Sequence, residues 1–192
     1  MNINEILGKK IIDKNIKDLA KIAEMTFNTE TFKISKIYGS VGNPLSKKYY
    51  PIEPSEIIGF GDYLQVSLTQ EDCEKNKLDK IPTSEEKDAT INEIIGKKVL
   101  NTKGNDNGRV SGINLDFEEK IITGLTIELP NTSSFGKKNI MTITKNDIAG
   151  IGDYILINKV IKSEETEDKK EETEDKEEET EDEEEKVEVS IE

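Results

Sequence analysis

The sequence predicts an all-β protein with two tandem small β-barrels and short helical turns, followed by a disordered acidic C-terminal tail. Three observations predict this fold class: an internal repeat, apolar residues at every second position, and acidic charge concentrated near the C-terminus. An internal repeat decides how many units a chain contains. Each unit here has about 70 residues. At that size a closed barrel hides the strand edges that a lone open sheet would expose.

The repeat consists of two pairs of matching segments. INEILGKK at residues 3–10 recurs as INEIIGKK at residues 91–98, with seven identities in eight positions. IIGFGDYLQV at residues 57–66 recurs as IAGIGDYILI at residues 148–157. Matches in the same order near both ends of a unit indicate a tandem duplication. We therefore expect the first barrel at residues 1–69 and the second at residues 91–161.

Within each unit the apolar residues have the spacing of β-strands. Ile113, Leu115 and Phe117 alternate with polar residues, and a similar alternation runs from Ile121 to Leu129. Isoleucine is the commonest apolar residue and alanine is rare, which favours strands over helices. In the first unit we expect strands at 9–13, 20–28, 31–39, 48–52 and 62–68, with counterparts in the second unit, and helical turns at 4–7, 54–57 and 145–148.

Residues 70–90 separate the two units and are predicted to be a polar linker, because they are charged and show no apolar period. They include the only cysteine of the chain, Cys73, between Asp72 and Glu74. Acidic neighbours raise the pKa of a thiol, so we expect an incidental exposed thiol rather than a nucleophile. A single cysteine cannot form an intramolecular disulfide, which is consistent with a reducing compartment.

The predicted tail, residues 162–192, carries the net charge of the chain. Residues 163–192 hold 18 acidic and 4 basic side chains, whereas residues 1–162 hold 23 of each. EETEDKK, EETEDKE and EETEDEE follow one another without an apolar residue, so this segment cannot offset the entropy cost of an ordered chain. The tail ends in VEVSIE, and strand addition to a partner would use the candidate partner-binding residues Val187, Val189 and Ile191. The alternative is a solvated chain end.

The composition argues against catalysis. The chain has no His, so no imidazole base, His-based triad or His metal ligand is available. We therefore predict that the protein is not an enzyme and has no cofactor or metal site. The neutral body lacks the basic excess of nucleic-acid-binding proteins. No apolar run reaches the roughly 18 residues of a spanning helix, and no secretory signal opens the chain. We expect a cytoplasmic protein that meets a membrane only through a partner.

Two kinds of motif have both a structural and a functional interpretation. KGNDNG at residues 103–108 supplies the glycines of a hairpin turn, and it lacks the terminal bidentate Glu of a calcium loop. The GKK triplets at residues 8–10, 96–98 and 136–138 could bind phosphate or anionic lipid. A body with no net charge favours the other interpretation, in which these lysines are solvated strand ends.

The second unit resembles the PRC-barrel family through its start IIGKKV, the segment GRVSGI, the pair IITGL and the closing DIAGIGDYILI. Over both units the resemblance covers about 140 of the 192 residues. The first unit departs from the pattern at residues 15–21, where NIKDLAK replaces the glycine turn. The resemblance implies a six-stranded barrel that serves as an adaptor or assembly module.

Two barrels on one chain, 26 Lys against one Arg, and an acidic tail resemble the archaeal cell-division proteins of the CdpB type. This resemblance implies a non-enzymatic adaptor that self-associates as a homo-dimer or oligomer. It also implies a SepF-type partner in assembly of the FtsZ ring at the division site. The alternative is an RNA-processing or ribosome-assembly factor of the RimM type. The neutral body and a tail that would repel RNA argue against that alternative.

Overall fold

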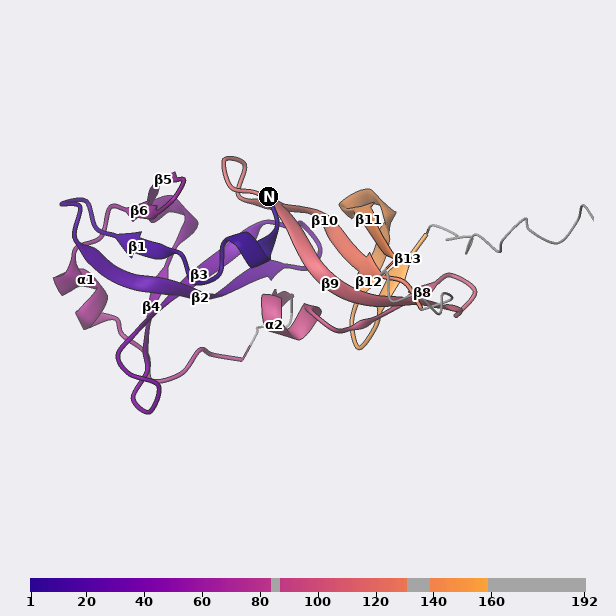
Figure 1. Cartoon of the computed structure of the whole chain (residues 1–192), viewed down its shortest axis with the longest axis horizontal. Helices are drawn as coiled ribbons and strands as arrows, with labels where there is room; N and C mark the ends of the chain where they lie inside the picture. The colour runs from indigo at the N-terminus through magenta and orange to yellow at the C-terminus, as the bar shows by residue number, and fades with distance from the viewer. Residues whose placement is uncertain (84–86, 131–138, 159–192) are drawn as a thin grey trace, which may run out of the picture. The chain divides into compact units, whose positions relative to one another are not determined.

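The computed structural model describes residues 1–83, 87–130 and 139–158 (Figure 1). The first unit contains η1 (Ile3–Glu5), β1 (Lys10–Ile12), β2 (Asp18–Asn28), β3 (Ile34–Val41), β4 (Lys48–Ile52), η2 (Pro54–Glu56), β5 (Ile57–Phe60), β6 (Leu64–Val66) and α1 (Gln70–Lys75). The second contains β7 (Asp88–Thr90), α2 (Ile91–Ile94), β8 (Lys98–Asn101), β9 (Asp106–Asp116), β10 (Ile121–Glu128), β11 (Ile140–Thr144), η3 (Lys145–Asp147), β12 (Ile148–Ile151) and β13 (Ile155–Ile157).

The two units share one strand order, which confirms the predicted all-β class with two barrel-like sheets. The first sheet runs β4-β3-β2-β1-β6-β5, and the second runs β11-β10-β9-β8-β13-β12. In each sheet one pair is parallel, β1 with β6 and β8 with β13. The five strands predicted for the first unit are present with shifted ends. A sixth strand, β5, lies partly where a helical turn was expected, because the turn ends at Glu56.

Each sheet must curl, because its first and last strands are neighbours in the chain. In the first sheet β4 and β5 lie at opposite ends of the strand order but are joined only by η2. Ile57 lies five positions after Ile52, and five residue steps span at most about 18 Å. The edge strands of a flat six-stranded sheet would lie about 24 Å apart. Curling brings these edges together, and the two faces of the sheet then differ in burial.

The buried side chains are mostly aliphatic and follow a period of two along the strands that is interrupted at irregularities of the strand pairing. In β9, Val110, Ile113 and Leu115 are buried, and in β10 Ile122, Leu125 and Ile127 are buried. Seven isoleucines of the first unit and its junction are at most 2% exposed: Ile3, Ile6, Ile11, Ile22, Ile37, Ile52 and Ile91. Burial of β-branched side chains on curled sheets accounts for the isoleucine-rich composition.

The first hairpin forms even though the glycine turn is absent from its sequence. In the second unit the Asn101 side chain accepts hydrogen bonds from the N–H groups of Lys103 and Asn105, at 3.0 and 2.9 Å. In the first unit Asp13, at the equivalent position, accepts from two N–H groups in the same way, at 2.8 Å each. Ile16 has φ +64° where Gly104 has φ +79°. A carboxylate thus holds the turn together, and Ile16 adopts a conformation that favours glycine.

The two units join through reciprocal contacts between equivalent residues. Lys33 lies opposite Ile121 in an antiparallel bridge. On either side of it the Ile34 N–H donates to the Lys120 carbonyl at 2.9 Å, and the Ile122 N–H donates to the Phe32 carbonyl at 2.7 Å. Each residue named here lies 88 positions from its counterpart. The contact is therefore isologous, as in a homodimer, although both halves belong to one chain.

The segment that opens each unit pairs with the long strand of the other unit. β7 is antiparallel to β2, with Thr90 opposite Thr26. At the equivalent place Asn2 bridges Asn114 of β9, and the Leu115 N–H donates to the Met1 carbonyl at 2.9 Å. This exchange buries Ile3 and Ile91 at the junction, where each is 0% exposed. The junction is thus part of the hydrophobic core.

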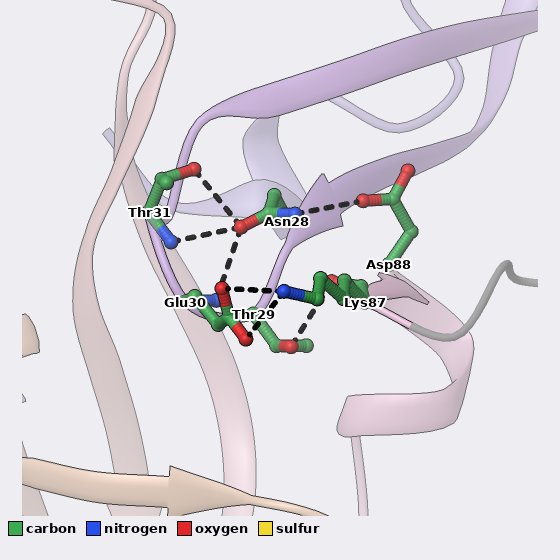
Figure 2. Close-up of polar contacts among 6 residues, drawn as sticks. All are labelled: Asn28, Thr29, Glu30, Thr31, Lys87 and Asp88. Carbon is green, nitrogen blue, oxygen red and sulfur yellow. Dashed lines mark hydrogen bonds and ion pairs between the residues drawn. The ribbon is translucent and has the colours of Figure 1, made fainter.

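Side-chain hydrogen bonds hold the start of β7 against the turn after β2 (Figure 2). The Asn28 amide donates to Asp88 at 3.4 Å, and its oxygen accepts from the N–H and hydroxyl groups of Thr31 at 2.9 and 3.0 Å. Lys87 forms an ion pair with Glu30 at 3.1 Å. These contacts are mostly exposed, so they position the chain more than they stabilise it.

Part of the segment predicted as a polar linker is ordered against the first sheet. Thr69 and Asp72 form the capping box of α1, and Cys73 on this helix is 2% exposed. The Tyr50 hydroxyl on β4 donates to Glu74. The prediction of an exposed thiol was therefore wrong, because one cysteine among charged residues gives no detectable apolar period. Among the residues that the structure describes, no helix is long and apolar enough to span a bilayer.

Candidate functional site

A groove of about 740 Å³ lies where β5 of the first unit meets the end of β9 in the second. Its walls come from the first residue of the chain, from β5 and from the turn between β9 and β10. The lining residues are Met1, Ile57, Ile58, Gly59, Phe60, Leu115, Asp116, Phe117, Glu118 and Lys120. Because both units contribute, neither repeat alone could form this site.

Two stacked aromatic rings form the apolar part of the groove. The centroids of Phe60 and Phe117 are 3.9 Å apart, and the rings are within 8° of parallel. Phe117 is 8% exposed. On the first unit the Lys9 ammonium lies 5.0 Å from the centroid of the Phe60 ring and donates to the Gly61 carbonyl at 2.6 Å. The stack therefore couples the two units and is held in place by a cation on one side.

The charged residues of the groove mostly bind its own backbone. Asp116 accepts hydrogen bonds from the N–H groups of Glu118 and Glu119, at 2.9 and 3.0 Å. The Lys120 ammonium donates to the Pro54 carbonyl at 2.6 Å. Lys120 also has φ +56°, in the left-handed region. These bonds fix the turn that carries Phe117, so these charges shape the groove.

The rim of the groove carries exposed apolar side chains. Met1 is 52% exposed and Ile58 is 56% exposed. An apolar rim beside an aromatic pair is typical of a surface that binds another protein. It would bury apolar side chains of that protein and leave the charged turn at the edge.

The equivalent positions in the other half of the molecule cannot form this stack. Thr29 replaces Phe117, and Ile151 replaces Phe60. The Thr29 N–H and hydroxyl both donate to the Lys87 carbonyl, at 2.8 and 3.0 Å (Figure 2). The duplication has therefore diverged at this place, so that an aromatic surface is present on one side and a hydrogen-bonded turn on the other.

The GKK lysines that the structure describes have intramolecular partners, and the partners are the same in both units. Lys9 donates to the Gly61 carbonyl, and Lys97 donates to the Gly152 carbonyl. The second lysine of each triplet pairs with an aspartate of the next strand: Lys10 with Asp18 at 2.7 Å, and Lys98 with Asp106 at 3.4 Å. These lysines therefore hold hairpins together. The third triplet, at residues 136–138, lies outside the described residues.

The remaining predicted features can be placed in part. KGNDNG lies in the turn between β8 and β9 and in the start of β9, as a hairpin turn requires. The candidate binding residues Val187, Val189 and Ile191 lie outside the described residues. Sequence reasoning missed the groove. The one available signal was Phe117, an aromatic residue directly after a strand, at a position where the first unit has Thr29.

Comparison with known protein families identifies a PRC-barrel domain at residues 86–163. This range contains the second unit from just before β7 to beyond β13. No curated protein matches the chain. The first unit has the same strand order as the matched domain, so the structure extends the likeness to the fold of residues 1–69.

Proposed function

We propose that the protein is a non-enzymatic adaptor that self-associates and binds a protein partner through the groove at the junction of its two units. A PRC-barrel domain suggests an interaction or scaffold role in general. The resemblance to CdpB-type proteins adds the more specific proposal that the partner is a SepF-type division protein. The adaptor would then act at the division site, in assembly of the FtsZ ring.

The observation that carries this proposal is the stack of Phe60 on Phe117 in a groove that is also lined by the exposed side chains of Met1 and Ile58. Interfaces between proteins are enriched in aromatic residues and methionine at their centres. The groove also depends on the junction of the units, so a duplicated chain acquires a site that a single barrel lacks.

The charge distribution supports a protein partner over RNA. Residues 1–162 have no net charge, and the four lysines of the first two GKK triplets bind groups within the protein. Contacts with phosphates would need free cations and would make binding sensitive to salt. A RimM-type role in RNA processing is therefore the weaker proposal.

Replacement of Ile58 by Asp tests the groove. Ile58 is 56% exposed, so the Ile58→Asp variant should fold. Calorimetry with a purified SepF-type protein should show binding weakened at least tenfold, because the new carboxylate would be buried against apolar groups. Ala149 is the exposed counterpart of Ile58 on β12, and the matched variant Ala149→Asp should bind like the wild type.

Equal affinity of the wild type and both variants would refute the groove as the binding site. Submicromolar, salt-sensitive binding of RNA would support the RimM-type role instead. The role of VEVSIE is tested with a protein that ends at Lys162. We expect it to bind the partner as tightly as the full chain, because the groove lies within residues 1–120. A clear loss of affinity would show that Val187, Val189 and Ile191 contribute.

A further inference from the structure

The two equivalent edge strands, β4 and β11, differ in whether their outer side is occupied. Each lies at the end of its sheet, next to β3 and β10 respectively. On β4, Tyr49 exchanges two backbone hydrogen bonds of 2.9 Å with Leu78, which lies beyond α1. Ile140 is the counterpart of Tyr49 on β11. Within the part of the chain that the structure describes, nothing pairs with the outer side of β11.

The register shows which residues of β11 present backbone groups outward. The Asn139 carbonyl accepts a hydrogen bond from the Leu129 N–H at 2.9 Å, so the backbone N–H and C=O groups of Asn139 point toward β10. Because orientation alternates along a strand, Ile140 and Thr142 direct their N–H and C=O groups away from the sheet. Pro51, the counterpart of Thr142 on β4, has no N–H to donate. At this position β11 therefore has an outward N–H group, unpaired among the described residues, where β4 has none.

The side chains of β11 give no protection against pairing with another strand. Ile140–Thr144 has the sequence IMTIT, with no charge and no proline. Ile140 is 58% exposed. Proteins usually blunt a free edge with a lysine or a proline, and β4 carries both, at Lys48 and Pro51. β11 is thus suited to accept a further strand.

We propose that β11 pairs with β11 of a second copy of this chain, in an antiparallel arrangement that makes the two second sheets continuous. This inference rests on the self-association in the proposed function and assigns a surface to it. Because the strand is uncharged, pairing it with itself brings no like charges together. Residues 1–162 also have no net charge, so the bodies do not repel each other. The bridge of Lys33 with Ile121 shows on a smaller scale that equivalent segments of the two units can pair antiparallel.

In this arrangement Ile140 of one copy lies opposite Thr142 of the other. Each such pair exchanges both of its N–H···O=C bonds, as Tyr49 and Leu78 do on β4. A contact of five residues is smaller than a standard interface of about 800 Å² per partner. We therefore expect a weak dimer with a dissociation constant on the order of 10⁻⁵ to 10⁻⁴ M.

Sedimentation velocity of the full chain from about 5 to about 500 μM spans that range of affinity. The wild type should shift from monomer to dimer. Thr142→Pro removes one outward N–H and introduces the residue that β4 already has at this position, so the fold should be kept and dimerisation weakened at least tenfold. Ile140→Lys should act in the same way. Leu45→Lys, at a fully exposed loop residue, is the control and should dimerise like the wild type.

Hydrogen exchange locates the contact independently of the variants. The amides of Ile140 and Thr142 should exchange more slowly as the protein concentration rises, while those of Met141 and Ile143, which face β10, should not change. A monomer at every concentration would overturn the inference, as would a Thr142→Pro protein that dimerises normally. Loss of dimerisation in Ile58→Asp with a normal Thr142→Pro would place self-association at the groove instead. Normal edge pairing without partner binding would refute only the proposed function.

Discussion

Glu24 of the first unit accepts hydrogen bonds from both the backbone N–H and the side-chain amide of Asn92 in the second unit. Its carboxylate also accepts from the N–H groups of Met25 and Ile91, at 2.9 and 3.1 Å. Glu24 is 4% exposed. Ile91 and Asn92 open helix α2 (Figure 1). Their N–H groups have no partners within the helix. One buried carboxylate from the first unit thus caps the first turn of the second.

Replacing Glu24 by Ala should lower the free energy of unfolding by about 2–4 kcal/mol, because buried N–H groups would lose their acceptor. Urea denaturation followed by circular dichroism measures this change. Glu30→Ala is the control, since Glu30 pairs with Lys87 at an exposed site and should cost no more than about 0.5 kcal/mol. A similar small loss in both variants would show that the Glu24 network does not join the units.

The contribution of Glu24 should also depend on pH. Burial raises the pKa of this carboxyl above its ordinary value of 4.5, although its hydrogen bonds oppose the shift. The folded protein then holds the proton more tightly than the unfolded chain does. The stabilising contribution therefore grows as the pH falls through the folded-state pKa toward 4.5, and it decreases as the pH rises. Unfolding of the wild type and Glu24→Ala, compared between pH 7 and pH 4.5, should show the difference widening on the acid side.

The turn at Ile16 should be improved by glycine. Ile16 has φ +64° and is 76% exposed, so its side chain loses little burial when removed. A β-branched residue in the left-handed region costs about 1–2 kcal/mol of folding free energy. Glycine removes this strain, but it loses more chain entropy on folding, which offsets part of the gain. Ile16→Gly should raise the free energy of unfolding by about 0.5–1 kcal/mol in urea. The reverse change in the other unit, Gly104→Ile, should lower it, and a loss of stability in both variants would contradict the argument.

The repeat and the period of two were enough to predict the class, the two units and most strands. They were not enough for β5, where Ile57 and Ile58 are adjacent apolar residues before a glycine and show no alternation. They also did not predict that residues 88–90 pair with β2, because strand exchange between units depends on tertiary contacts. Asp13 was overlooked as a substitute for the glycine turn, since one carboxylate accepting two N–H bonds is invisible in a pattern of apolar residues.

The candidate site was the part least accessible to sequence reasoning. Phe60 and Phe117 are 57 positions apart and belong to different repeats, so no local spacing connects them. The repeat indicates the features that the two units share, whereas the groove forms at positions where their sequences differ. The lysines of the GKK triplets illustrate the opposite case: their repetition reflects equal structural roles at Gly61 and Gly152.

The thiol of Cys73 should be nearly unreactive in the folded protein. Burial, together with the nearby carboxylates of Asp72, Glu56 and Glu74, raises its pKa to about 11 from an ordinary 9.0. Reaction with Ellman's reagent at pH 8 should therefore be at least about 100-fold slower than in urea, because thiolate is scarce and access is blocked. The folded state keeps this proton more tightly, so stability should fall as the pH rises from 9 to 11. Equal rates with and without urea would show that α1 does not cover the thiol.

Cleavage between the units should leave two fragments that remain associated. Lys80 is exposed and precedes an irregular stretch, so trypsin should cut there, in addition to trimming the acidic tail after about residue 162. The second fragment would keep β7 paired with β2 and Asn92 bound to Glu24, and the Lys33–Ile121 bridge would be intact. The nicked body should therefore elute from a sizing column with the uncut body and separate only in denaturant. Elution as two fragments of about half the mass would show that the junction does not hold without the covalent link. Full protection of residues 79–83 from trypsin would show that this segment is part of the packed structure.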